Sequence, residues 1–444
     1  MKKLYLVSLG CPKNLVDSEL MLGSLQKSGF NVCQDPAEAT IILVNTCGFI
    51  QSAVEEAIDE ILQLIEFKKN DPEKLIVVTG CLVQRYGDSL KAELPEVDLF
   101  IGTDGFIDIA ARVEVLLGQR VSAEVLLGQP VFLMNSTNER TLSTPAHRAY
   151  LKITEGCSNR CSYCMIPSIR GKLRSRELDD IILEAQRLES QGVKELTLVG
   201  QDLTAYGIDL RGPKVDLPAL LQALLRETGI PWIRTLYLYP HRIKDSHLEL
   251  VAANPRLLPY FDIPLQHVSD SILRLMNRPY GYNKIEELFA RIATILPKAA
   301  IRTTFIVGFP GETPADVDML EKFMRLYRLN HVGIFPYSNE DGCDAAKLPN
   351  HCSDFEKEER MARLMAVQAE ISQEINAGFV GTVESVLVEG LSSETDLLME
   401  GRTRLQAPDI DGCVYINDGS CTAGDIVKIK FTEAHTYDLV GEVV

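Results

Sequence analysis

The stretch Glu155-Gly156-Cys157-Ser158-Asn159-Arg160-Cys161-Ser162-Tyr163-Cys164 comes directly after residues 149–154, an apolar run that predicts a strand. Its thiols have the spacing Cys-x3-Cys-x2-Cys. Thiolates are soft, charged donors, and several on one short loop can bind a single iron–sulfur cluster. Zinc is the competing metal, but no histidine or fourth cysteine stands nearby to close a tetrahedral site. Three structural cysteines this close together would be a coincidence. The motif predicts a four-iron cluster with one iron left open to a reacting molecule.

Strand and helix patterns alternate onward from this motif. Strands are expected at 149–154, 195–199, 234–239, 260–264, 300–307 and 331–336, and helices at 179–191, 217–226, 245–253, 271–276, 284–296 and 315–326. Six βα units predict a partial or full (β/α) barrel, whose active site lies at the carboxyl ends of the strands. The cysteine motif occupies that position after the first strand. A charged helix is expected at 355–376.

The first 118 residues show the same alternation. Strands are expected at 3–8, 41–45, 75–79 and 97–101, and helices at 15–28, 53–68 and 105–117. This spacing implies right-handed crossovers and a mostly parallel, doubly wound sheet.

Three further cysteines, Cys11, Cys47 and Cys81, each follow one of these strands. The carboxyl ends of parallel strands share one edge, where open α/β sheets place their ligands. Glycines at positions 10, 48 and 80 flank the cysteines and allow a close approach of the backbone. Each cysteine alone is better explained as an inert buried residue. Together they predict a second cluster held by three thiolates.

Two segments, 114–119 and 124–129, both read Glu-Val-Leu-Leu-Gly-Gln. Two such short copies are too little for a solenoid, and we interpret them as a local duplication that lengthens a connector. The polar stretch 135–144, which ends at Pro145, predicts a linker.

After Gly378 the pattern changes to short alternating strands, expected at 383–389, 396–403, 412–416 and 426–432. Asp/Gly/Ser turns separate them, which predicts a small all-β module, such as a five-stranded barrel. The expected fold is therefore α/β with three domains: a doubly wound parallel sheet at 1–134, a (β/α) barrel at 143–376 and a β-barrel at 378–444.

Composition limits the class of protein and its partners. The 444 residues exceed what one core holds, and 46% hydrophobic with 24% charged residues is typical of a globular chain. A net charge of −17 opposes tight nucleic-acid binding and favours a basic partner. No apolar run of about 18 residues predicts a membrane span, and the amino-terminal apolar stretch is too short for a signal peptide. Eleven cysteines, an odd number, fit cytoplasmic thiols and metal ligands better than a disulfide framework.

Along nearly its whole length the chain resembles a known family. The motif Cys157-x3-Cys161-x2-Cys164 with Tyr163 is similar to the signature of radical S-adenosylmethionine (radical SAM) enzymes. The added Cys11/Cys47/Cys81 domain and a carboxyl-terminal module similar to a TRAM domain narrow the resemblance to the methylthiotransferases. Five stretches resemble the ribosomal-protein (RimO-type) branch, at residues 7–14, 166–176, 237–240, 263–267 and 276–279. The duplicated segment has no place in the family pattern.

The resemblance implies an activity. Enzymes of this branch add a methylthio group to the β-carbon of an aspartate of ribosomal small-subunit protein twelve. That carbon carries an unactivated C–H bond, which no side-chain base deprotonates near neutral pH, so a cofactor must supply a radical. The implied cofactors are two 4Fe-4S clusters and S-adenosylmethionine, two molecules of which are consumed.

The resemblance also implies roles for particular residues and partners. Cys157, Cys161 and Cys164 would bind the cluster that carries S-adenosylmethionine, and the other three cysteines the cluster that carries the sulfur. Tyr163 is expected beside the adenine, and Gly308 beside the cofactor's sugar or amino-acid portion. Both could equally be packing and turn residues. The expected partners are ribosomal protein twelve and a reducing electron donor, with no membrane, and a monomer is the default expectation.

Two alternatives come from other classes of protein. A tRNA adenosine methylthiotransferase would use the same chemistry, but the acidic carboxyl-terminal module opposes it: residues 378–444 hold four basic and twelve acidic side chains. A non-enzymatic iron–sulfur carrier would explain the cysteines but not a barrel that opens onto an incomplete cluster.

The remaining five cysteines, at 33, 343, 352, 413 and 421, show no ligand pattern and are expected to be structural.

Overall fold

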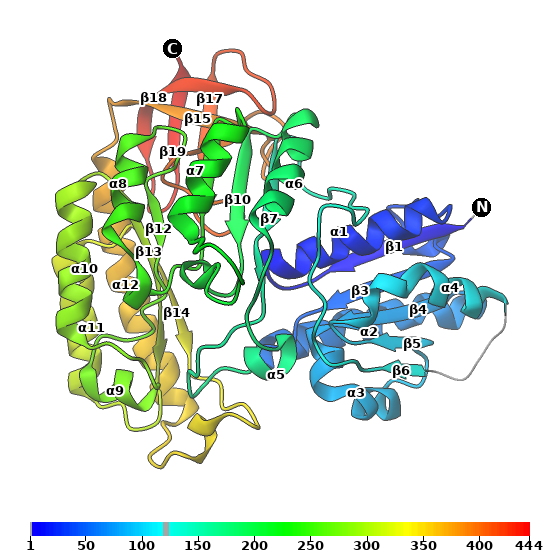
Figure 1. Ribbon diagram of the computed structural model, residues 1–444. Helices are drawn as coiled ribbons and strands as arrows, with labels where there is room; N and C mark the ends of the chain where they lie inside the picture. The colour runs from blue at the N-terminus through cyan, green and yellow to red at the C-terminus, as the bar shows by residue number, and fades with distance from the viewer. Residues whose placement is uncertain (1, 119–123) are drawn as a thin grey trace.

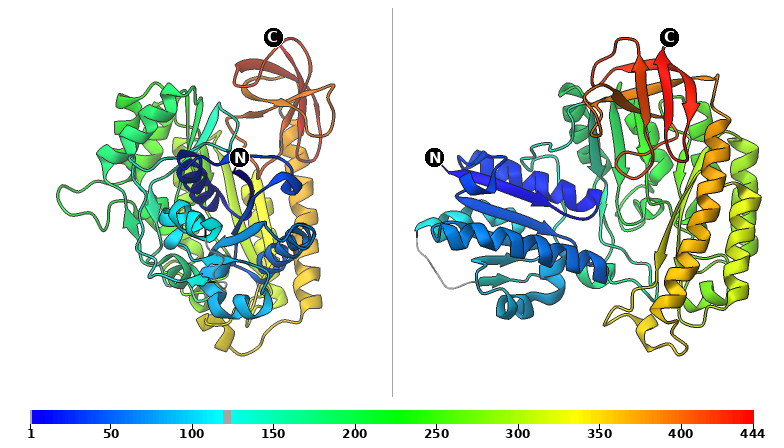
Figure 2. Two further views of the ribbon diagram at one scale, coloured as in Figure 1. Left: turned by 90° about the vertical axis from the view of Figure 1, so that its right-hand side faces the viewer. Right: turned by 180° about the vertical axis from the view of Figure 1, so that it is seen from behind.

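The computed structural model describes residues 2–118 and 124–444. An amino-terminal α/β domain lies beside a larger barrel, and a small β-barrel covers one end of the larger one (Figures 1 and 2). The predicted fold class, α/β with an added β-barrel, is confirmed. None of the described helices is both long and apolar enough to cross a bilayer.

The amino-terminal sheet has the strand order β2-β1-β3-β4-β5-β6, and all neighbouring strands are parallel. Its strands are β1 (Lys3–Ser8), β2 (Asn31–Val32), β3 (Ile41–Thr46), β4 (Leu75–Gly80), β5 (Leu99–Ile101) and β6 (Glu124–Leu126). Helices α1 (Pro12–Lys27) and α4 (Ile109–Gly118) pack on one face, and α2 (Gln51–Asn70) and α3 (Cys81–Glu93) on the other. The winding direction reverses between β1 and β3, where doubly wound sheets bind ligands at the carboxyl ends of the strands.

Sequence patterns missed three elements of this sheet: β2, β6 and α3. Helix α3 begins at Cys81 directly after β4, and Gly87 interrupts its helical geometry with a φ of +38°, which breaks the apolar periodicity. The duplicated segment adopts two conformations. Its first copy ends α4 up to Gly118, with Gln119 outside the described residues, while its second copy forms the edge strand β6. The interpretation of the second copy as a connector is therefore wrong.

The larger barrel is partial. Its parallel strands run in the order β7-β10-β11, then β12-β13-β14, and a parallel bridge between Ile233 and Leu257 joins the two ladders. The strands are β7 (Arg148–Lys152), β10 (Glu195–Val199), β11 (Trp232–Thr235), β12 (Tyr260–Asp262), β13 (Ala300–Val307) and β14 (His331–Pro336). The covering helices are α6 (Leu178–Ser190), α7 (Leu217–Glu227), α8 (Asp245–Ala253), α9 (Asp270–Leu275), α10 (Tyr282–Ile295), α11 (Pro314–Tyr327) and α12 (Asp354–Ala377).

The predicted barrel strands are confirmed with small shifts. The strand expected at 234–239 ends earlier, because Tyr237 has a φ of +59° and cannot continue an extended strand. The strand expected at 149–154 divides into β7 and the short β8 (Thr154–Glu155), which pairs with β9 (Arg174–Ser175). A short helix that the sequence did not predict, α5 (Ile166–Arg170), follows the cysteine loop.

The carboxyl-terminal module is a closed barrel with the strand order β15-β16-β17-β19-β18. Its strands are β15 (Val383–Leu391), β16 (Met399–Thr403), β17 (Val414–Asp418), β18 (Ile426–Ala434) and β19 (Leu439–Val443), of which β19 was not predicted. The module lies at the amino ends of the large barrel's strands, where Ala407 is fully buried against Tyr260 and Ala300. The cysteine loop lies at the opposite, carboxyl ends.

Candidate metal centres

The first cysteine triad lies on the loop between β8 and α5. Cys157, Cys161 and Cys164 line one cavity of about 350 Å³. The loop is anchored where the amide of Cys157 donates to the carbonyl of Gly171 over 3.0 Å. Burial raises the pKa of Cys157 to about 11 and that of Cys164 to about 12. The structure thus brings all three predicted residues of this motif to one opening at the carboxyl ends of the barrel strands.

Cys343 lines the same cavity, although its sequence surroundings showed no ligand pattern. It lies on the loop after β14 and is buried, with 4% of its surface exposed. Its thiol faces Cys164 closely enough to influence the pKa of that residue.

The second triad converges at the carboxyl edge of the amino-terminal sheet. Cys11 precedes α1 as its cap residue, Cys47 follows β3, and Cys81 is the first residue of α3. A β-carbon added to Gly10 would lie 2.8 Å from Cβ of Cys47, and one added to Gly48 would lie 3.0 Å from the carbonyl carbon of Cys81. The glycines beside the cysteines are thus what allows the three turns to pack together.

The pKa values of the three thiols in this second triad shift in different directions. Burial opposes ionisation of Cys11, but the positive charges of Lys13 and Arg170 outweigh it and lower the pKa of its thiol. Burial raises the pKa of Cys47, and it raises that of Cys81 to about 12 although Arg170 is adjacent. Cys11 and Cys81 also stand at helix amino termini, whose partial positive charge favours a thiolate.

Both triads fit an iron–sulfur cluster better than a single ion. Within residues 2–118 and 124–444, no three His, Cys, Asp or Glu side chains are close enough to share one metal ion. A cluster binds each thiolate through a different iron, so its ligands need not meet at one point. Thiols with raised pKa values stay protonated until a metal displaces the proton. The first triad lines one cavity and the second lies on three adjacent turns of one sheet edge, and the soft thiol donors of each fit the predicted group.

A network of buried charges joins the two triads. Arg170, at the end of α5, donates from Nε to Sγ of Cys81 over 3.3 Å and from Nη1 to Asp17 over 2.5 Å. Lys152 forms ion pairs with Asp17 and, over 2.8 Å, with Glu155, which stands two residues before Cys157. All four charged groups are at most 5% exposed. Arg170 and Glu155 lay inside quoted sequence motifs, but no sequence signal distinguished them from their neighbours.

Two more buried cations lie beside the triads, and both depend on aromatic rings. Nζ of Lys13 lies 3.4 Å from the centroid of the Tyr237 ring, which brings the amino-terminal domain against the rim of the barrel. The guanidinium of Arg278 lies among the rings of Tyr163, Tyr239 and Tyr280. Sequence analysis did not single out either cation, because cation–π partners far apart in the chain leave no local pattern.

Tyr163 and Gly308 are connected through Phe309. The ring of Tyr163 contacts that of Phe309 edge-on, with centroids 6.4 Å apart, and Gly308 precedes Phe309. Glu312 holds this turn, because its carboxylate accepts the Gly308 amide over 2.9 Å and pairs with Arg360 over 2.7 Å. A β-carbon on Gly308 would lie 2.3 Å from Cγ of Lys357, so the glycine is required for packing against α12. Neither Tyr163 nor Gly308 lines the 350 Å³ cavity itself.

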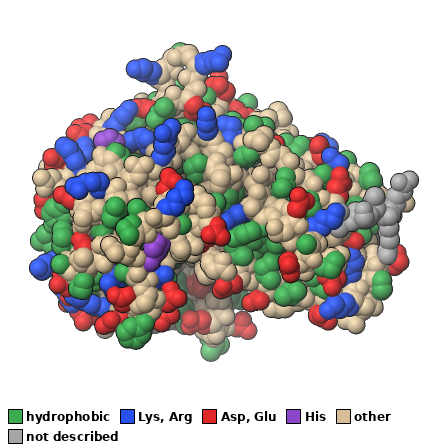
Figure 3. Space-filling view, turned by 90° about the horizontal axis from the view of Figure 1, so that it is seen from below, with side chains coloured by type: hydrophobic (Ala, Val, Ile, Leu, Met, Phe, Trp, Pro, Cys, Tyr) green, Lys and Arg blue, Asp and Glu red, His purple; other side chains and the backbone are tan. Residues whose placement is uncertain are grey.

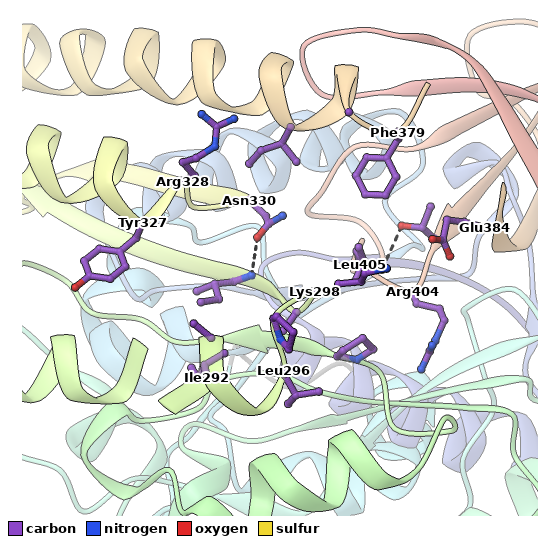
Figure 4. A pocket seen from close by; sticks show the side chains of 18 of the residues that line it. Ile292, Leu296, Lys298, Tyr327, Arg328, Asn330, Phe379, Glu384, Arg404 and Leu405 are labelled. Atoms are coloured by element: carbon purple, nitrogen blue, oxygen red, sulfur yellow. Dashed lines mark hydrogen bonds between the residues drawn. The ribbon is translucent and has the colours of Figure 1, made fainter. Parts of the chain in front are cut away.

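A larger cavity, of about 620 Å³, lies away from both triads (Figure 4). It opens between the amino ends of the barrel strands and the carboxyl-terminal module, among Lys298, Arg328, Phe379 and Arg404. It holds no cysteine, and its position opposite the catalytic end of a (β/α) barrel gives it no part in the chemistry of the triads.

Figure 3 shows the face seen from the catalytic end, where Lys and Arg side chains are interspersed with Asp and Glu.

Three family models match the chain in the order of its three parts. Residues 3–102 match "Uncharacterized protein family UPF0004", residues 151–324 match the radical SAM superfamily, and residues 380–444 match the TRAM domain. Solved structures agree with this fold. A radical SAM methyltransferase, TsrM, from Kitasatospora setae, solved with cobalamin and a 4Fe-4S cluster, is 14% identical with a TM-score of 0.55, over 87% of this chain and 81% of that one. The class is therefore a radical SAM protein with an added amino-terminal sheet and a TRAM barrel.

Curated relatives narrow the class to one family. The ribosomal protein uS12 methylthiotransferase RimO of Desulfotalea psychrophila is 54% identical over 100% of this chain and 99% of its own length. The RimO of Geobacter sulfurreducens is 46% identical over the same shares of the two chains. The chain belongs to the RimO family of ribosomal protein uS12 methylthiotransferases.

Proposed function

We propose that this protein adds a methylthio group to the β-carbon of an aspartate of ribosomal protein uS12, with two molecules of S-adenosylmethionine consumed. The observation that carries this proposal is the placement of the two cysteine triads. They lie at the carboxyl ends of two different parallel sheets, and Arg170, which ends the helix after the first triad, donates to Cys81 of the second. A link of this kind between the triads supports a reaction in which one substrate carbon first loses hydrogen and then gains sulfur.

The chain's own residues have distinct tasks in this proposal. Cys157, Cys161 and Cys164 hold one 4Fe-4S cluster, and Cys11, Cys47 and Cys81 hold the other. When bound, the first group with S-adenosylmethionine supplies the radical that removes the hydrogen, and the second supplies the sulfur. Tyr163 and Gly308 border S-adenosylmethionine on the side of Phe309.

The charge of the TRAM barrel supports a basic protein as the substrate over tRNA. Two of the four basic residues in 378–444 point into the molecule: Arg402 pairs with Glu195 over 2.6 Å, and Arg404 donates to the carbonyl of Pro255 over 2.7 Å. Lys428 and Lys430 are then the cations left to face solvent, against ten acidic residues once Glu389 and Asp411, whose side chains are largely buried, are set aside from the twelve. A barrel that grips a phosphate backbone needs a basic surface, whereas a basic ribosomal protein is attracted to an acidic one.

Several finer features complete the proposal. The domains extend over 1–134, 143–376 and 378–444, and the chain acts as a monomer in the cytoplasm. A low-potential electron donor would supply the electron that the cluster held by Cys157, Cys161 and Cys164 needs for radical formation.

The test is mass spectrometry of ribosomal proteins from a bacterial host that lacks its own uS12 methylthiotransferase, with and without this chain. We expect uS12 to gain one methylthio group on an aspartate when the chain is present. The Cys161→Ala and Cys81→Ala variants should each abolish the gain. An unmodified uS12 together with a methylthio group on tRNA adenosine would instead establish the tRNA activity.

A further inference from the structure

Arg170 is the point at which the second cysteine triad contacts the radical SAM domain. Its side chain is 3% exposed, and Cys81, which accepts its Nε–H over 3.3 Å, is 7% exposed. The remaining donors are also engaged: Nη1 contacts Asp17 and Glu155, and Nη2 donates to Oδ1 of Asn14 over 2.9 Å. The planar guanidinium is thus held in one orientation, with a single N–H aimed at a cysteine sulfur.

The segment that carries Arg170 also carries the first triad. Helix α5 begins two residues after Cys164, and Arg170 ends it. Glu155, two residues before Cys157, accepts from Nη1 of Arg170 over 3.5 Å. Both ends of the first cysteine loop are therefore tied to the residue that contacts the second triad.

A cation that donates to a cluster sulfur changes the properties of the cluster. Hydrogen bonds to the sulfurs and the local charge are among the factors that set the reduction potential of an iron–sulfur cluster. Residues that orient metal ligands from outside the ligand set typically contribute 10- to 100-fold to metal affinity or activity. Lys152 and Arg170 together balance Asp17 and Glu155, so loss of the Arg170 charge would leave the surroundings of Cys81 one unit more negative as well as removing the donated N–H.

We infer that Arg170 is a positioning residue for the second cluster: its N–H···S bond to Cys81 raises that cluster's reduction potential and secures its retention. This inference rests on the proposed function, in which Cys11, Cys47 and Cys81 hold a cluster. It also makes the second site dependent on the radical SAM domain, since the amino-terminal sheet alone lacks this donor.

The experiment uses the full chain with Cys157, Cys161 and Cys164 all changed to Ala, so that only the second cluster forms on anaerobic reconstitution. The midpoint potential is measured by an EPR-monitored redox titration, and iron release to a chelator is timed. We expect Arg170→Gln to lower the potential and to accelerate iron release roughly 10- to 100-fold. Arg170→Lys keeps the positive charge but loses the planar guanidinium with its several N–H donors. Its potential and its rate of iron release should lie between those of the parent and of the Gln variant.

Arg174→Gln is the matched control, because Arg174 lies on the same segment and donates only to backbone carbonyls, those of Lys172, Phe132 and Arg170. It should keep the parent potential. If the triple alanine protein binds no iron, the proposed second cluster is wrong. If it binds a cluster whose potential and iron release are the same with Arg, Lys or Gln at position 170, the cluster stands and the role of Arg170 is refuted. If the Gln variant holds no iron, the test is made on the Lys variant. A potential below that of the parent supports the role of Arg170, and an unchanged potential refutes it.

Discussion

Lys13 and Lys152 are two ammonium groups buried between the same two domains, in opposite electrostatic surroundings. Lys152 is 1% exposed and contacts the carboxylates of Asp17 and Glu155. Lys13 is 8% exposed and, among the residues that the structure describes, has no carboxylate within ion-pair distance. Burial opposes the charge of Lys13, but the Cys11 thiol and the Tyr237 ring outweigh burial and raise the pKa of Lys13. Its positive charge suits an anionic group bound beside Cys11.

We therefore expect Lys13→Met to change the stability of the cluster-free protein by no more than about 2 kcal/mol, while methylthio transfer falls. Methionine keeps the volume of the lysine stem and removes a charge that no carboxylate of the described residues pairs with. Urea unfolding under reducing conditions measures the first effect, and uS12 modification the second.

Lys152→Met is the contrasting variant. It leaves Asp17 and Glu155 short of a partner and should cost about 3–5 kcal/mol. Equal destabilisation by the two substitutions would contradict this assignment of paired and unpaired charges.

His247 is a buried group that we expect to make the protein sensitive to acid. It is 2% exposed, its Nε2 has no hydrogen-bond partner, and the ring of Phe261 lies 5.8 Å away. Burial lowers its pKa to about 4, against 6.5 in the unfolded chain. Below pH 6.5 the unfolded state therefore binds the proton first, and stability is lost as the pH falls toward 4. We expect about 3 kcal/mol in total, of which about 2 kcal/mol is lost by pH 5.

The measurement is the free energy of unfolding of the parent and of His247→Leu at pH 7 and pH 5. The substitution should reduce the loss between the two pH values by about 2 kcal/mol. An identical loss in both proteins would show that His247 is not the group that titrates.

At the level of elements, the contact between the β3–α2 turn and α3 holds the second triad together. A β-carbon on Gly48 would lie 2.7 Å from both Cα and N of Leu82, and these backbone atoms cannot move independently of α3. Gly48→Ala is expected to cost about 1–3 kcal/mol and to lower the iron bound by the second triad.

Gly118→Ala is the control, since no heavy atom of residues 2–118 and 124–444 lies within 4 Å of the added β-carbon at the end of α4. There alanine should be neutral or stabilising by up to about 1 kcal/mol. Urea unfolding and iron content are measured on both variants. Full iron binding by Gly48→Ala would mean that the turn accommodates a side chain.

At the scale of the whole molecule, a buried ionic network fastens the TRAM barrel to the larger barrel. Arg402 contacts Glu389 within its own barrel and Glu195 of β10 over 2.6 Å, and Arg234 contacts the same Glu195 over 2.7 Å. The side chains of Glu195 and Arg234 are fully buried, and that of Arg402 is 5% exposed. The TRAM barrel is thus a fixed part of the molecule rather than a flexible arm.

We expect Arg402→Met to destabilise the protein by about 3–5 kcal/mol, because it leaves buried carboxylates unpaired. The TRAM barrel should also become separable, with proteolysis near Gly378 and a second unfolding transition. Lys430→Met, which removes an exposed partner of Glu442, should change stability by less than about 1 kcal/mol. A single transition at the parent midpoint for Arg402→Met would refute the fastening role of the network.

Elements that carry a strong local pattern were predicted well from sequence. Strands β10, β13 and β14 and helix α8 have the expected bounds, and α12 differs by one residue at each end. Elements with a weak or interrupted pattern were missed. Helix α3 has a left-handed glycine inside it, and β19 closes its barrel through pairings with β17 and β18 that sequence spacing does not encode.

The six cysteines were singled out from the sequence by two rules. Cys157, Cys161 and Cys164 share one loop with close spacing, and Cys11, Cys47 and Cys81 each follow a strand of one parallel sheet, where such strands end at one edge. The arginine, lysine and carboxylate partners of these cysteines follow no such rule. Arg170 is 89 residues from Cys81, and Lys152 is 135 residues from Asp17. Only the packing of the two domains brings them together.

The duplicated segment shows where local sequence stops and tertiary structure takes over. The same five residues end helix α4 at 114–118 and contribute strand β6 at 124–126. The two copies have identical helix and strand propensities, so their surroundings determine which structure each copy adopts. In the first copy Leu116, with Val113 before it, packs on the sheet from a helix. In the second copy residues 124–126 pair with the edge of β5 as a strand. The sequence by itself determined the strand–helix alternation, the parallel sheets and the grouping of the six cysteines into two triads, because these depend on periodicity and chain order. The tertiary structure alone decided the conformation of the repeat and the charged contacts between the triads, because those depend on residues far apart in the chain.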